Sequence, residues 1–229
     1  MKKSLIILGA GVLLSAVSFG QAVKDRNIIP VAVNLNQVLR MNITNGGNIE
    51  FMFNSVDDYK NGISGDATAS SSSNPNSSDP MYVTDFTISS STRWKLTYGS
   101  EQATFIGADN PSNTLALNNV GFGLIQSGVH VFEAAGSGKG TTVGSELFSA
   151  PTDNANAVSG LDVFPTDLIE DNDATTANAG DETDNAFQLV WRCGTSEGGM
   201  NTAALIDQSP SPTPDRYVTN VLFELALDN

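Results

Sequence analysis

The sequence has little of the chemistry that most enzymes and disulfide-stabilised domains use. Among 229 residues there is one cysteine, Cys193, and one histidine, His130. A single cysteine excludes an internal disulfide, so the fold must depend on its apolar core, which a chain of this length can build. A Ser/His/Asp triad would have to use His130, and a reactive Cys193 would need a basic neighbour that no motif provides. We therefore expect a buried, inert thiol and no enzymatic activity, with a hydrolase that uses paired carboxylates as an alternative.

Basic residues are also scarce. There are 11 of them against 25 acidic residues, which gives a formal net charge of −14. A strongly acidic surface repels nucleic acid and anionic lipid, so we expect neither as a partner. Lys2 and Lys3 precede an apolar run over residues 5–17, which is typical of a secretory signal peptide and short for a membrane span. The pattern predicts a signal peptide over residues 1–20, no membrane span in residues 21–229, and a secreted or cell-surface protein.

Long stretches with helical periodicity are missing, and period-two alternation takes their place. In residues 49–53, for example, Ile49, Phe51 and Phe53 share one face and polar Glu50 lies on the other. Because successive side chains of a strand point to opposite sides, each such segment offers one dry face. We predict an all-β, antiparallel β-sandwich of about ten strands. The predicted strands are 28–35, 37–43, 48–54, 81–89, 91–99, 103–106, 114–118, 121–125, 128–133, 186–194 and 216–229.

Two loop-rich stretches interrupt this pattern. Residues 61–80 are mostly serine and other small polar residues, and residues 134–185 are rich in Gly, Ala, Asn and Asp. Neither offers enough apolar side chains to bury a core, so we predict a Ser-rich and an acidic loop. Brief apolar patches in the second stretch allow short strands, or a helical turn around residues 167–169. With no internal repeat and no linker, residues 21–229 are predicted to form one domain.

One segment, residues 134–142 with the sequence AAGSGKGTT, resembles a phosphate-binding loop. Lys139 would be the phosphate lysine, but Glu133 stands where the first glycine is required. Gly144 and Pro151 leave little room for the helix that must follow. The sequence therefore predicts an ordinary loop here and no nucleotide as a partner.

The acidic run over residues 167–185 offers a metal site. Asp171, Asp173, Asp181 and Asp184 are suitable calcium ligands in type, but their spacing does not meet the EF-hand pattern. We predict a solvated acidic loop, with an irregular calcium site as the alternative. No other cofactor is indicated.

Sugar binding by exposed aromatic side chains is a second hypothesis for function. Trp94 and Trp191 fall on the apolar faces of their predicted strands, which favours the core. Tyr59 and Tyr82 flank the Ser-rich loop and are the better surface candidates. A secreted carbohydrate- or ligand-binding module, with surface glycans as partners, is therefore the alternative function.

The layout as a whole resembles secreted β-sandwich surface proteins of Gram-negative bacteria, including fimbrial and filament subunits. The resemblance lies in the N-terminal pattern, the segment VKDRNIIPVAVNLNQVLRMNITNGGNIEFMFN (residues 23–54), the acidic body and the apolar final strand. It implies a structural or adhesive role with self-association. Val31, Val33 and Leu35 share one face of a terminal segment that could add to the sheet of a neighbouring subunit. The alternative is an ordinary first strand of the same molecule.

Overall fold

The computed structural model describes residues 29–64, 82–130, 133–134, 142–143, 158–170 and 178–228. These residues form an all-β sandwich, as predicted, and one short α-helix that was not. The chain divides into residues 1–35, of which 29–35 are described, and residues 36–229. Most of the predicted signal peptide, Ser-rich loop and acidic loop lies outside the described residues. No helix in the described ranges is long and apolar enough to cross a membrane.

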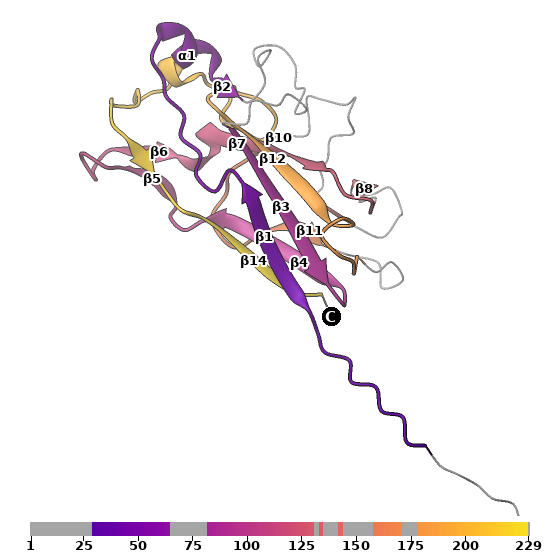
Figure 1. Ribbon diagram of the computed structural model, residues 1–229. Coiled ribbons are helices and arrows are strands. Elements are labelled where there is room, and N and C mark those ends of the chain that lie inside the picture. The colour runs from indigo at the N-terminus through magenta and orange to yellow at the C-terminus, as the bar shows by residue number, and fades with distance from the viewer. Residues whose placement is uncertain are drawn as a thin grey trace, which may run out of the picture. The chain divides into compact units, whose positions relative to one another are not determined.

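Two sheets form the sandwich (Figure 1). One has the order β1-β3-β12-β7-β10, with β2 also on β12, and the other has the order β14-β4-β11-β9-β8. A small sheet, β13-β5-β6, extends the second, because β13 and β14 follow each other and pair with β5 and β4. All pairs are antiparallel except β8 with β9. The bounds are β1 Leu39–Asn45, α1 Val56–Asn61, β2 Ile63–Ser64, β3 Val83–Ser90, β4 Trp94–Ser100, β5 Thr104–Gly107, β6 Thr114–Ala116, β7 Val120–Gln126, β8 Glu133–Ala134, β9 Thr142–Val143, β10 Val158–Gly160, β11 Thr166–Glu170, β12 Ala186–Cys193, β13 Tyr217–Val218 and β14 Val221–Leu227.

The core lies between the two large sheets and is rich in aromatic rings. Phe86 of β3 stacks on Phe187 of β12 at 5.2 Å between ring centroids, and Trp94 of β4 meets Phe187 edge-on at 6.1 Å. On β4, Trp94, Leu96 and Tyr98 are buried while the residues between them are half-exposed. The alternation of the sequence therefore gives the packing that it predicted.

Three predicted strands are wrong within the described residues. Residues 29–35 belong to no strand, and residues 128–130 form a bend that leaves His130 half-buried beside Asn185. Residues 48–54 are also not a strand, although Ile49, Phe51 and Phe53 pack against the core and the residues between them are exposed. Their alternation reflects burial of one face without pairing of the backbone.

The predicted loops contain short strands, which the sequence allowed in residues 134–185 but not in residues 61–80. Residues 63–64 form β2 inside the predicted Ser-rich loop, and β9, β10 and β11 lie within the predicted acidic loop. Of the two alternatives for residues 167–169, the short strand is confirmed and the helical turn is wrong, because this stretch is part of β11 and pairs with β4. Leu168 and Ile169 are both completely buried.

Strand β12 is more central than its sequence indicates. It pairs with β3, β7 and β2. By period-two alternation Arg192 would lie on the polar face, opposite Leu189 and Trp191, yet it is 0% exposed and forms an ion pair with Glu197. A buried guanidinium needs such a partner, since an isolated charge in the interior is very unfavourable.

Candidate functional site

Residues 29–35 place four large apolar side chains in solvent. Ile29, Val31, Val33 and Leu35 are 82%, 83%, 75% and 91% exposed. They alternate with Pro30, Ala32 and Asn34, so in an extended conformation all four share one face. Soluble proteins rarely expose a continuous apolar face of this kind unless it meets a partner. The structure therefore leaves the predicted exchange residues Val31, Val33 and Leu35 accessible for one.

Strand β14 is the edge of its sheet. Over seven consecutive positions it pairs with β4, from Val221 opposite Ser100 to Leu227 opposite Trp94, without a register shift. Val221, Phe223 and Leu225 pack against the core but are only half-buried. The core beneath this edge is therefore incompletely covered.

The hydrogen bonds at the two ends of β14 show which of its residues bond to β4 and which direct their backbone groups away from it. The carbonyl oxygen of Asn220 accepts from the Glu101 N–H at 2.9 Å, and the Asp228 N–H donates to the Arg93 carbonyl at 3.3 Å. In an antiparallel ladder, residues that bond to one neighbour alternate with residues that face the other side. The even-numbered residues of β14 therefore bond to β4.

The odd-numbered residues direct their N–H and C=O groups to the open side. They are Val221, Phe223, Leu225 and Leu227, whose side chains also share the inner face. Among the residues that the structure describes, none bonds to these outward groups. This edge thus offers a row of donors and acceptors above a partly exposed apolar face.

Strand β1 is the facing edge of the other sheet, and it lies beside β14 (Figure 1). Its pairing with β3 shifts register between Ile43 and Asn45, which marks a bulge. Arg40 is exposed in the middle of the strand. Bulges and charged side chains are the usual means by which proteins keep an edge from pairing. β14 has one charge, Glu224, and neither a bulge nor a proline.

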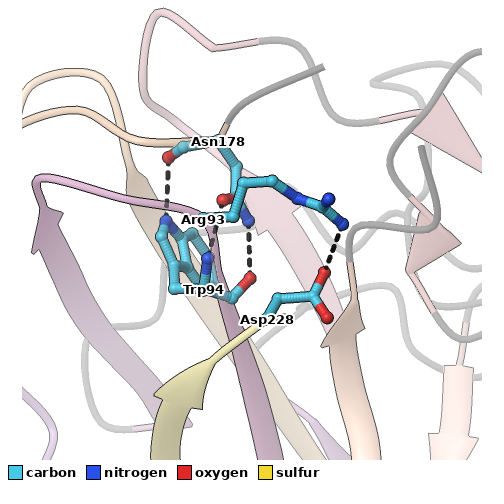
Figure 2. A network of polar contacts seen from close by, with 4 residues as sticks. All are labelled: Arg93, Trp94, Asn178 and Asp228. Carbon is cyan, nitrogen blue, oxygen red and sulfur yellow. Dashed lines mark hydrogen bonds and ion pairs between the residues drawn. The ribbon is translucent and has the colours of Figure 1, made fainter. Parts of the chain in front are cut away.

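A network of polar contacts lies where β4 begins and β14 ends (Figure 2). The Trp94 backbone N–H donates to Asn178 Oδ1 at 3.0 Å, and its indole N–H donates to the Asn178 carbonyl at 2.8 Å. The Asn178 side-chain amide donates in return to the Trp94 carbonyl at 2.8 Å. Arg93 forms an ion pair with Asp228 at 2.9 Å. The Asn178 bonds thus hold the start of β4, and the ion pair holds the residue that follows β14 beside it.

A second polar cluster holds the other end of the same edge, near β13. The Asp215 carboxylate accepts hydrogen bonds from the backbone N–H groups of Asp109 and Asn110 and from the Asn113 side-chain amide. These bonds, the Asp109 N–H first, hold the pKa of Asp215 below its usual value of 3.8. Arg216 forms an exposed ion pair with Glu50 at 2.9 Å.

Two of the four predicted calcium ligands, Asp181 and Asp184, lie in the described residues. Asp181 Oδ1 accepts from the Thr183 and Asp184 backbone N–H groups, and Asp184 Oδ2 accepts from the Asp181 N–H. The two carboxylates thus close a turn. Asp171 and Asp173 lie outside the described residues, as does Lys139 of the loop that resembles a phosphate site. In the described part of the chain, no three acidic, histidine or cysteine side chains come together as a metal site would require.

The aromatic side chains give little support to sugar stacking. Trp94 and Trp191 are buried, as their alternation predicted. Tyr82, expected at the surface, is also buried and stacks on Phe51 at 4.8 Å between ring centroids. Tyr59 is half-buried and packs beside Phe53. A polar surface hollow of about 550 Å³ lies beside β6 and the proline-rich residues 208–213, and Tyr217 is the aromatic residue in its lining.

Cys193 lies in the core at the end of β12, and burial raises the pKa of its thiol to about 12.

In comparisons with models of known protein families and with curated protein sequences, no match to this chain was found. Within the described residues, the exposed segment 29–35 and the open edge of β14 are the two features that point to contact with a partner.

Proposed function

We propose that the protein is a non-enzymatic structural or adhesive protein of the cell surface or extracellular space, and that its subunits self-assemble by β-strand addition through residues 29–35. The observation that supports this is the exposure of Ile29, Val31, Val33 and Leu35 on one face of an extended segment. An extended peptide that adds to a sheet gains affinity from main-chain hydrogen bonds and from alternate side chains that enter the sheet's apolar face.

The energies involved are sufficient for such a contact. Full burial of a Val, Leu or Ile side chain contributes about 1.5–3 kcal/mol, so four of them would contribute roughly 6–12 kcal/mol. Association costs about 4–15 kcal/mol in lost freedom. Main-chain hydrogen bonds, at about 0.5–1.5 kcal/mol each, would add the remainder. Both the apolar face and the backbone pairing are therefore needed.

The proposed location outside the cell is supported by the sequence. The pattern of residues 1–20 is that of an exported protein, and a formal net charge of −14 favours solubility outside the cell. A glycan-binding module is the weaker alternative, because Trp94, Trp191 and Tyr82 all lie in the core.

Electron microscopy of the purified protein, expressed from Met1, tests the proposal. We expect regular polymers from the natural sequence and none from Val33→Asp, which places a charge on the apolar face. The matched control is Asn34→Asp, which adds the same charge one position along, on the opposite face. It should still assemble, and both variants should have the Tm of the unassembled natural protein. A natural protein that stays monomeric at high concentration by light scattering, or a Val33→Asp variant that polymerises as well as the control, would refute the proposal.

A further inference from the structure

We infer that the acceptor for residues 29–35 is the open edge of β14 in a second copy of the chain, and that the two segments pair antiparallel along their full length. This inference rests on the proposed self-assembly. It names the surface that receives the added strand and the register in which it is received.

The two segments match in length and in the arrangement of their faces. Each has seven residues, and in each the four odd-numbered residues are apolar and share one face. In full antiparallel overlap, Val31 lies opposite Leu225 and Val33 opposite Phe223. The added apolar face then covers the side chains of β14 that are only half-buried in the single molecule.

The hydrogen bonds match as well. β14 directs the N–H and C=O groups of its odd-numbered residues outward, so the odd-numbered residues of the added strand take part in the bonded pairs. Pro30, which has no N–H, falls at an even position, where no donor toward β14 is needed. Ala32 and Asn34 then lie on the outer face, opposite Glu224 and Leu222.

The acceptor is β14 because β1 is protected and β14 is not. β1 has a bulge near Asn45 and an exposed Arg40, whereas β14 is regular over all seven pairs with β4. A long, regular and apolar edge is the kind that accepts another strand.

We place the acceptor in another copy because the residues just before β1 are already held by hydrogen bonds to their own subunit. The Val38 N–H donates to Ser91 Oγ at 2.9 Å, the Val38 carbonyl accepts from the Ser91 N–H at 3.0 Å, and the Gln37 side-chain amide donates to Thr92 Oγ1 at 3.0 Å. For residues 29–35 to fold back onto the same subunit, Leu35 and Asn36 would have to form a tight turn. Two-residue turns favour glycine, which neither position has. Such a strand would also run parallel to its own β14, the less stable pairing.

Disulfide cross-linking tests this assignment. Ala32→Cys and Glu224→Cys proteins of different tagged mass are purified separately, mixed under assembly conditions and oxidised. Opposed residues of a non-bonded antiparallel pair have Cα atoms about 4.5 Å apart, which is within disulfide range. We expect a disulfide-linked heterodimer on a non-reducing gel. The native Cys193 stays in place, because it is buried and its thiol is protonated.

The matched control replaces Glu224→Cys by Thr97→Cys. Thr97 pairs with Glu224 and lies on the same outer face, one strand further from the open edge. One further strand spacing of about 4.8 Å puts it roughly 9–10 Å from position 32, beyond disulfide range. We expect at least a tenfold lower yield of heterodimer with Thr97→Cys.

Hydrogen exchange on the natural sequence gives a readout without substitutions. The amides of Phe223 and Leu225 should gain protection on assembly, whereas those of Leu222 and Glu224 should be protected already in the single molecule. Equal cross-linking at positions 97 and 224, or unchanged exchange at Phe223 and Leu225, would overturn the inference. If polymers formed without the 32–224 cross-link, the assignment of β14 as the acceptor would be refuted, and the proposed self-assembly would not. Absence of both polymers and cross-links would refute the proposed function as well.

Discussion

Asn178 is expected to be one of the most sensitive positions of the fold, and Asn178→Ala tests this. The substitution removes the acceptor of the Trp94 N–H and the donor to the Trp94 carbonyl, while the indole N–H keeps the main-chain carbonyl of residue 178. Trp94 and Asn178 are both buried, so water cannot replace the lost partners. An unsatisfied buried group costs about 1–3 kcal/mol, and two of them give a loss of about 3 kcal/mol after relaxation.

The assay is urea unfolding followed by tryptophan fluorescence, in the Val33→Asp background so that assembly does not contribute. With a slope of about 2–3 kcal/mol per molar urea, the midpoint should fall by about 1 M at unchanged slope. Asn45→Ala is the matched control, because its side-chain amide makes one exposed bond to Asp85 at 3.3 Å. The control should change stability by less than about 0.5 kcal/mol. If Asn178→Ala changed stability no more than this control does, the argument from buried polar pairing would be refuted.

Two further outcomes follow from the titrating groups. Burial raises the pKa of Cys193 to about 12. Its thiol should therefore not react with a thiol reagent at pH 8 in the native protein and should react fully in denaturant. Rapid reaction of the native protein would contradict the burial of Cys193. The pKa of Asp215 is lowered in the native state by its hydrogen bonds, the Asp109 N–H first, so its stabilisation is present above the unfolded value of about 3.8 and is lost as pH falls through the lowered pKa. Asp215→Asn should therefore show a shallower loss of stability below pH 4 in acid unfolding curves, and curves of equal steepness would contradict this.

Much of the fold could be predicted from alternation alone. Trp94, Leu96 and Tyr98 point into the core as their period-two pattern indicates. The same pattern failed over residues 48–54, because alternation reports which face is buried and not whether the backbone has a neighbour. The burial of Arg192 could not be predicted for a related reason, since only the assembled sheet shows that β12 is central and covered on both faces.

The sequence missed helix α1 and left strand β11 undecided between a short strand and a helical turn, for different reasons. The helix has six residues, too few for a periodic pattern, yet Ser55 and Asp58 form a capping box that is visible in the sequence. β11 lies in polar surroundings, and its apolar residues Leu168 and Ile169 are adjacent rather than alternating. The register shift between Asp167 and Ile169 explains how both become buried.

Of the two parts of the candidate site, the sequence could predict segment 29–35 but not the open edge of β14. Val31, Val33 and Leu35 could be singled out by their pattern near the start of the chain. The open edge of β14 could not, because the final strand has the same alternation whether it lies at the centre of a sheet or at its margin. Its outward groups follow only from the hydrogen bonds at Asn220 and Asp228.

Pro30 sets the width of any assembly built in this way. Once residues 29–35 lie along β14 of a neighbour, their other side becomes the new margin of that sheet, and Pro30 presents a ring there in place of a donor. A third strand would meet a gap in its ladder at that point. Growth would then proceed from subunit to subunit in single file, and lateral stacking into broad, amyloid-like sheets would be discouraged by one residue.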